Sequence, residues 1–448
     1  MLPHLLVGLA VTVAGTAPPT PDTVPLYEDL GDHHHAVTAT ARAQDYFDQG
    51  LRLHYGFNHA EAIRSFARGA ELDPGCAMCW WGVALSAGPN INAAMDSASG
   101  ARAHRAVTRA QELAARVSEK ERVFIEALAR RYDPDPTAPR PPLDSAYARA
   151  MGGVADRYRT DDDAHALYGA ALMMLSPWDY WLDDRTLRPS GERALEHLER
   201  VVARNQDHAG ACHFYIHLVE SAHPRWAEDC AERLPDLMPG AGHVVHMPAH
   251  VYIRVGRYAD AVETNLHAAH ADEEHVEDMA PDGVYMLGYY PHNYHFIWFA
   301  GSMAGMSAEA IAAARQTAEE VNRDLMRAPG LAALQHYLVT PLFALVRFGR
   351  WDEVLEEPAP PADLSYPTGI RHYARALAFT ARDEPDRALE ELSGLRGAME
   401  DRSLEEMLIW EINPASAILA IAEKVVEGEM AAAAGDHDGA IRALRSGV

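Results

Sequence analysis

Basic residues are scarce in this chain. Its 448 residues include 39 Lys and Arg against 65 Asp and Glu, so its formal net charge is −26 with neutral histidine. A surface of that sign repels phosphate groups, and we therefore expect neither nucleic acid nor an anionic membrane as a partner. After the N-terminus, no apolar run approaches the roughly 20 residues that a membrane-spanning helix needs, so we also expect no membrane span.

Common catalytic and nucleotide-binding motifs are absent as well. The sequence has no Gly-rich phosphate loop and no Gly-x-Ser-x-Gly motif. A zinc protease would place glutamate directly after the first histidine of a helical pair, but Phe214 and Tyr215 follow His213. Nothing therefore points to nucleotide binding or to a protease of that class. The acidic run from Asp161 to Asp163 is interpreted as a solvated helix cap.

Cysteine is also rare, with four residues in the whole chain. Cys76 and Cys79 form a Cys-x-x-Cys pair, which is typical of half a metal site or of a redox pair, yet no second pair accompanies it. Structural disulfides or buried thiols are the plainer interpretation in an exported protein. Cys212 and Cys230 fall on successive predicted helices, where a bridge between them is feasible.

The N-terminus resembles a secretory signal. An apolar run from Leu5 to Ala17 ends in small residues and precedes a Pro/Thr-rich stretch, although no Lys or Arg precedes the run. We expect residues 1–25 to be a signal peptide and leader, and the mature protein to be secreted or extracytoplasmic.

Internal repeats decide the predicted fold. In the segment 43–74, Gly50 is followed by Ala62, Phe66 and Pro74 at offsets of 12, 16 and 24 residues. Further units begin at His208 and Gly242, and looser copies follow towards the C-terminus. The periodicity is helical throughout, so we expect an all-α protein. Within it, Ser118-Glu119-Lys120-Glu121 predicts a capping box that opens a helix.

The pattern resembles the tetratricopeptide repeat (TPR), whose period of 34 residues also separates Ala227 from Ala261. Over most of the chain after Ala43, the sequence is similar to exported bacterial TPR proteins. The motifs that carry this resemblance are Gly56-Phe57-Asn58-His59, Leu72-Asp73-Pro74-x-Cys76-Ala77-Met78, Gly88-Pro89-Asn90-Ile91-Asn92, His243-x-x-His246-Met247-Pro248-Ala249-His250 and Tyr290-Pro291-His292-Asn293-x-His295.

The resemblance implies a TPR-like α-solenoid of antiparallel helix hairpins, interrupted by an irregular helical insert. We expect N-terminal TPR-like helices over residues 40–100 and an irregular helical region with a Pro-rich linker over residues 101–207. Residues 208–448 would then form a C-terminal TPR-like solenoid that carries most of the candidate site.

Histidine is abundant, with 24 residues. His243, His246 and His250 follow an i, i+3, i+7 spacing, which puts them on one stripe of a helix where they can converge on one point. His213 and His217 are four residues apart, with Glu220 on the same helical face. Convergent imidazoles are ligands that a transition metal prefers.

The TPR resemblance places more histidines in a ligand groove, because positions 2, 5 and 9 of the first helix of each repeat face it. His243, His246 and His250 take these positions in one repeat, and His292 and His295 take positions 2 and 5 of a later one. His54 and His59 would join them only if the solenoid curls. A lone histidine on such a helix is more often a packing residue than a ligand, so the repetition carries the prediction.

The sequence therefore predicts a metalloprotein. Metal ligands are expected among His213, His217, His243, His246, His250, His292, His295, His54 and His59, and Glu220 is the candidate catalytic residue. An imidazole-rich site favours copper, with zinc second, over calcium or magnesium.

The leading hypothesis is a copper-dependent oxidoreductase that acts on a small molecule or peptide held in the concave groove. Two alternatives stay open at this point. One is a non-catalytic TPR scaffold that binds peptide or protein partners. The other is a protein of metal storage or delivery, and the fold alone does not decide between them.

Overall fold

The structure of the protein is a computed structural model, and it describes residues 24–275, 285–328, 330–410 and 412–448. Most of the predicted signal peptide and leader, residues 1–25, lies outside the described residues. The chain divides into two compact units, Met1–Asn293 and Tyr294–Val448, which we describe separately.

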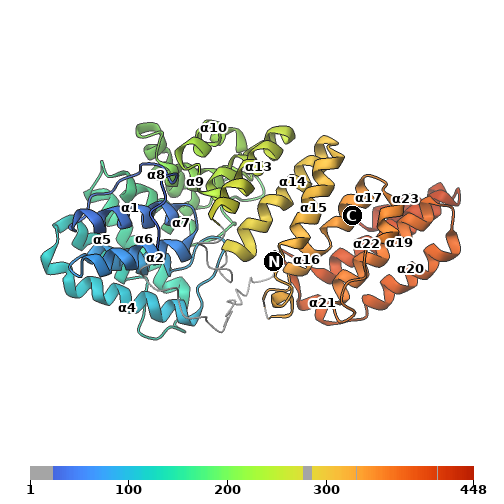
Figure 1. Ribbon diagram of the computed structural model, residues 1–448, viewed down its shortest axis with the longest axis horizontal. Helices are drawn as coiled ribbons and strands as arrows, with labels where there is room; N and C mark the ends of the chain where they lie inside the picture. The colour runs from blue at the N-terminus through green and yellow to red at the C-terminus, as the bar shows by residue number, and fades with distance from the viewer. Residues whose placement is uncertain (1–23, 276–284, 329, 411) are drawn as a thin grey trace. The chain divides into compact units, whose positions relative to one another are not determined.

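Unit 1 consists mainly of α-helices, and it also contains two 3₁₀ turns, η2 and η3, and a π-helical turn, η5 (Figure 1). In chain order the elements are α1 (Ala41–Tyr55), α2 (His59–Leu72), α3 (Ala77–Ser86), α4 (Ser97–Leu113), η2 (Ala114–Arg116), α5 (Glu119–Ala129), α6 (Arg140–Arg157), α7 (Asp162–Met173), α8 (Pro189–Arg204), α9 (Ala209–Val219), η3 (Pro224–Ala227), α10 (Glu228–Leu237), α11 (Gly242–His246), α12 (Pro248–Val255), α13 (Tyr258–His275) and η5 (Tyr285–Tyr289).

The boundary between the units falls within α14 (Tyr290–Ala304), and unit 2 is again built of helices (Figure 1). They are α15 (Ser307–Glu319), η6 (Leu325–Arg327), α16 (Leu334–Leu338), α17 (Thr340–Arg347), α18 (Trp351–Glu356), α19 (Ser365–Ala381), α20 (Pro385–Ala398), α21 (Ser403–Glu406), α22 (Ala415–Ala433) and α23 (His437–Ser446). A two-stranded antiparallel ladder, β1 (Leu408–Ile409) with β2 (Asn413–Pro414), precedes α22.

The repeat signature of segment 43–74 forms the hairpin of α1 and α2. Ala62 and Phe66 of α2 have no exposed surface. A Cβ at Gly50 would approach the Phe66 ring to 2.8 Å, and one at Gly82 to 2.3 Å, so these two glycines let three helices close around one aromatic ring. The signature therefore marks close helix contacts.

The predicted capping box is confirmed at the start of α5. The Ser118 side chain accepts a hydrogen bond from the Glu121 backbone N–H, and the Glu121 carboxylate accepts one from the Ser118 N–H. The other Glu121 contacts come from the backbone N–H and hydroxyl of Thr38, which tie the N-terminal segment to this helix.

All four cysteines form disulfides, Cys76–Cys79 and Cys212–Cys230. The first closes the start of α3. The second joins α9 to α10, and its Cys212 directly precedes His213, so it fixes a helix that carries two candidate ligands.

Removing Cys212–Cys230 by a double substitution to alanine should cost more stability than removing Cys76–Cys79. The two bridges close loops with sequence separations of 18 and 3. Loop-closure entropy then gives about 3 kcal/mol for the longer loop and about 2 kcal/mol for the shorter one. Urea unfolding of the metal-free variants measures both losses, and equal losses would contradict an entropic origin.

The expected fold class, an all-α TPR-like solenoid of helix hairpins, is confirmed. No helix in the described part of the chain is both long and apolar enough to cross a membrane. The boundaries drawn at residues 40–100, 101–207 and 208–448 stay predictions.

Candidate metal centre

The histidine stripe lies on two consecutive helices, α11 and α12, where the sequence predicted one. The interruption comes at Met247 and Pro248, because proline has no N–H to donate to the helix ladder. Met247 keeps helical angles, φ −53° and ψ −35°, so the stripe continues across the break. Its three imidazoles nevertheless do not converge on one point.

His243 belongs to a first triad with His213 and His217 of α9. One ligand atom from each of these residues lies within 4.8 Å of the other two. The ring centroids of His213 are 4.9 Å from His217 and 5.0 Å from His243. Two helices from successive repeats thus build one three-imidazole group.

The second triad consists of His246, His250 and His292, again with ligand atoms within 4.8 Å of one another. The ring of His246 lies 4.8 Å from that of His250 and 4.9 Å from that of His292. Helical rise explains the division, since seven residues advance about 10 Å along a helix. His243 and His250 are too far apart along the axis to share one ion, although the two triads are neighbours.

Glu220, the residue directly after α9, contacts one histidine of each triad. Its carboxylate oxygens lie 3.1 Å from Nδ1 of His217 and 2.9 Å from Nδ1 of His250, and one of them accepts a hydrogen bond from Nε of Arg254 at 3.2 Å. Burial alone would raise the pKa of Glu220, but the adjacent His250 and His217 outweigh it and lower that pKa below its usual range. The carboxylate therefore keeps the proton on Nδ1 of both rings.

Similar contacts orient other ligands. Nδ1 of His213 lies 2.5 Å from the backbone oxygen of Tyr55, and Nδ1 of His246 lies 2.6 Å from Oδ1 of Asn265. With each Nδ1 proton used in this way, Nε2 carries the lone pair that a metal needs. Asn265 and the Tyr55 carbonyl were not predicted, because nothing in their spacing relates them to the histidines.

The first triad is sealed from water, whereas the second is partly open. His213, His217 and His243 are buried, and Nε2 of each has no hydrogen-bond partner among the described residues. The His250 side chain is 12% exposed, and His292 is half-buried. Burial, together with the neighbouring imidazoles, lowers the pKa of His213 and His243 well below its ordinary value, so both rings are neutral and able to ligate.

Aromatic residues wall the first triad. The Phe57 ring lies 4.4 Å from that of His213 and 5.6 Å from that of His243, and the Tyr289 ring lies 4.3 Å from His243. Phe57 has a left-handed backbone, with φ 58°, which is uncommon for a bulky residue and typical of functional sites. Tyr289 belongs to η5, which leads into α14 and His292.

Three predicted ligands lie outside the triads. His54 and His59 stack on each other at 4.8 Å, and Nδ1 of His54 contacts the Ser86 hydroxyl at 3.1 Å. His295 packs in unit 2 against Trp298, at 4.8 Å, and Tyr337, at 5.4 Å. No group of three close metal-ligating atoms among the described residues includes any of them.

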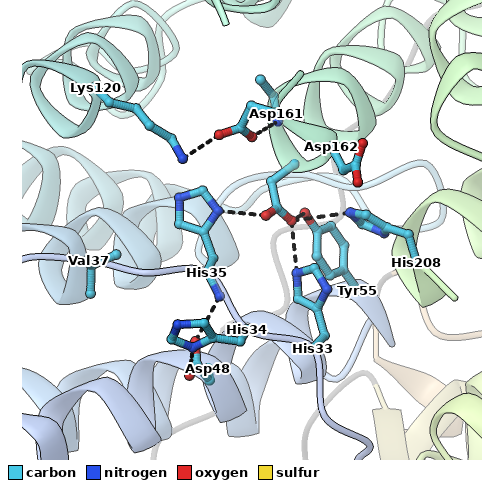
Figure 2. A network of polar contacts seen from close by, with 12 residues as sticks. His33, His34, His35, Val37, Asp48, Tyr55, Lys120, Asp161, Asp162 and His208 are labelled. Atoms are coloured by element: carbon cyan, nitrogen blue, oxygen red, sulfur yellow. Dashed lines mark hydrogen bonds and ion pairs between the residues drawn. The ribbon is translucent and has the colours of Figure 1, made fainter. Parts of the chain in front are cut away.

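A second polar cluster surrounds Asp163, and it corrects the interpretation of residues 161–163 as solvated. Asp161 does cap α7, but Asp163 is only 6% exposed. Its carboxylate meets Nε2 of His33 at 3.0 Å, Nδ1 of His35 at 2.6 Å and the Tyr55 hydroxyl at 2.5 Å. His208 adds Nε2 at 3.3 Å, and Figure 2 shows these side chains directed at one carboxylate.

The Asp163 cluster contains imidazole and carboxylate groups, as metal sites do, but these groups are hydrogen-bonded to one another. Nδ1 of His208 accepts the Ala211 backbone N–H at 3.1 Å, as the N-cap of α9. In the neutral ring the proton is therefore on Nε2, which points at Asp163 and has no lone pair for a metal. The cluster fastens residues 33–35 to α1, α7 and α9.

Comparisons with known proteins add little to this picture. No family model and no curated protein matches the sequence. Among solved structures, the chain is similar to human IFIT1 in a dimer with m7Gppp-AAAA, at 11% identity and a TM-score of 0.37 over 93% of this chain and 91% of that one. Yeast Tom70 is similar at 10% identity and a TM-score of 0.34, over 91% and 85%. At these TM-scores neither likeness bears on function.

Proposed function

We propose that this protein is an exported TPR-like metalloprotein that binds two transition-metal ions, one in each histidine triad. The observation that carries the proposal is the pair of adjacent three-imidazole groups, one of them wholly buried, with Nδ1 of four rings held by Glu220, Asn265 and the Tyr55 carbonyl. Two disulfides support the extracytoplasmic location, because disulfides persist in oxidising compartments.

The donor set favours copper, with zinc second. Both triads offer only imidazole nitrogen, and no thiolate is available because all four cysteines are paired. Glu220 is engaged by His217, His250 and Arg254, which suits an orienting residue better than a ligand. We therefore assign Glu220 a positioning role at both triads.

An oxidoreductase fits this arrangement better than a carrier. Three protein ligands leave a coordination position open, as catalytic metal sites do, whereas structural sites are filled by four. Copper bound by these histidines would supply electron transfer between an organic substrate and O₂. The partly open His250 and His292 give a small molecule or peptide access to the second triad, while the buried first triad excludes water.

Metal storage or delivery is the second candidate, since it uses the same ligands without turnover. The burial of the first triad favours retention of an ion there. Oxygen consumption in the presence of a reductant separates the two functions, because a carrier shows none above that of free metal.

Elemental analysis of full-length protein, purified without an affinity tag and incubated with copper, zinc or iron in turn, tests the proposal. We expect two ions per chain in the wild-type protein and one in His243→Ala or in His292→Ala, because each substitution removes a ligand from one triad only. His295→Ala, on the same helix as His292, and the surface variant His437→Ala should each keep two. A wild-type protein without bound metal would overturn the proposal.

A further inference from the structure

A small cavity in unit 1 lies beside the first triad. Its volume is about 40 Å³, and helices α1, α2, α3, α6, α7 and α9 supply most of its walls. Apolar residues such as Leu85, Leu167 and Met173 make up much of the lining. The polar lining includes Arg131, His54 and His59.

The charge around this cavity is positive. Arg131 is only 4% exposed, and the described residues that line the cavity include no carboxylate. Arg131 forms an ion pair with Asp144, whose Oδ1 lies 3.6 Å from Nε of Arg131. The same oxygen lies closer to Nη2 of Arg140, at 2.5 Å. One carboxylate thus serves two guanidinium groups, and no second carboxylate of the described residues forms an ion pair with Arg131.

Hydrogen-bonding groups at the cavity also remain unused. Nη2 of Arg131 donates to the Pro89 carbonyl at 2.8 Å, while its Nε, although buried, has no hydrogen-bond partner among the described residues. Nε2 of His59 is in the same situation. Burial, and then Arg131, lowers the pKa of His59 to about 4, so its ring is neutral at pH 7.

The cavity and the first triad share walls. Phe57 lines the cavity, and its ring also contacts His59 at 5.8 Å and His213 at 4.4 Å. Phe214, the next residue after His213, is a second shared wall. A molecule anchored at Arg131 would therefore be separated from the first triad by one aromatic ring.

From this geometry we infer that the cavity binds a small monoanion of the carboxylate class through Arg131. Its volume is about three times the roughly 10–15 Å³ that one water molecule needs, which matches a group of three or so heavy atoms. A planar guanidinium also suits a planar carboxylate. This anion binding does not rest on the proposed function.

Titration of metal-stripped, full-length protein with acetate tests the inference, with acetamide as an uncharged analogue of the same shape. Calorimetry in a buffer free of other small anions should show saturable binding of acetate and much weaker binding of acetamide. Arg131→Gln should weaken acetate binding by about 10-fold or more, because a charge-assisted hydrogen bond is lost. Asp144→Asn should strengthen it several-fold, since it removes the anion that competes for Arg131.

The paired variants distinguish a binding site from a structural ion pair. If Arg131 had only a structural role, Arg131→Gln would not weaken acetate binding and Asp144→Asn would not strengthen it. That result would overturn the inference. The inference would also be overturned if acetate and acetamide bound with equal affinity, or if neither compound bound. Circular dichroism identifies a variant that does not fold, in which case the other variant and the wild-type comparison decide. Because the protein is metal-free, a failure here is distinct from a failure to bind metal.

Discussion

Glu220→Gln is expected to weaken metal binding at one or both triads, by about 10–100-fold in affinity. The carboxylate contacts Nδ1 of His217 in the first triad and Nδ1 of His250 in the second. An amide of the same shape offers only one acceptor oxygen, so at least one ring loses the contact that keeps its proton on Nδ1. Competition with a chromophoric chelator would measure the affinity of each ion.

The matched control for this substitution is Glu232→Gln. Glu232 also pairs with an arginine, Arg257, but its side chain is exposed and contacts neither triad. It should leave both affinities unchanged. A normal affinity for both ions in Glu220→Gln would contradict the positioning role of Glu220.

Asp163→Asn should be the most destabilising single polar substitution proposed here, at a cost of about 3–5 kcal/mol in the free energy of unfolding. It removes the buried charge that His33, His35, His208 and Tyr55 share, and a neutral amide cannot accept hydrogen bonds from all of them. Urea unfolding followed by circular dichroism measures the loss.

The adjacent Asp162→Asn serves as control for that experiment. Asp162 pairs with Arg204 on the surface and accepts a hydrogen bond from Asn205. Exposed pairs of this kind contribute about 0–1 kcal/mol. Similar losses for the two variants would contradict the assignment of Asp163 as the buried anion of its cluster.

The stability difference between wild-type protein and Asp163→Asn should also depend on pH. Burial opposes ionisation of Asp163, but His35 and His33 lower its pKa well below the usual value, so its contribution is present above about pH 4 and is lost as the pH falls further. Burial likewise disfavours the His33 cation, yet Asp163 raises its pKa, so that contribution is complete below about pH 6.5 and is lost as the pH rises. The difference should therefore be largest between about pH 4 and 6.5. A difference that grew above that range would contradict the pairing.

Local features of the fold were predictable from the sequence because they depend on neighbours in the chain. The hairpin of α1 and α2 follows from Gly50, Ala62 and Phe66 at repeat spacing, and the capping box follows from Ser118 and Glu121. The stripe of His243, His246 and His250 likewise follows from helical periodicity alone.

The grouping of ligands was less predictable, because it depends on how successive repeats pack. Spacing suggested that His243, His246 and His250 share one ion. The rise along the helix axis instead groups His243 with the two histidines of α9, and groups His246 and His250 with His292 of α14. Long-range contacts were out of reach for the same reason. His33 and His35 meet Asp163 from about 130 residues away, and no local pattern distinguishes that buried carboxylate from the half-buried Asp162 beside it.

Tyr55 connects the first triad to the Asp163 cluster. Its hydroxyl binds Asp163, on which His33 and His35 converge, and its backbone oxygen receives Nδ1 of His213. The residue that orients one ligand ring thus also contacts the carboxylate to which the N-terminal segment is bound. Docking of residues 33–35 and the geometry of the first triad are therefore linked through one side chain.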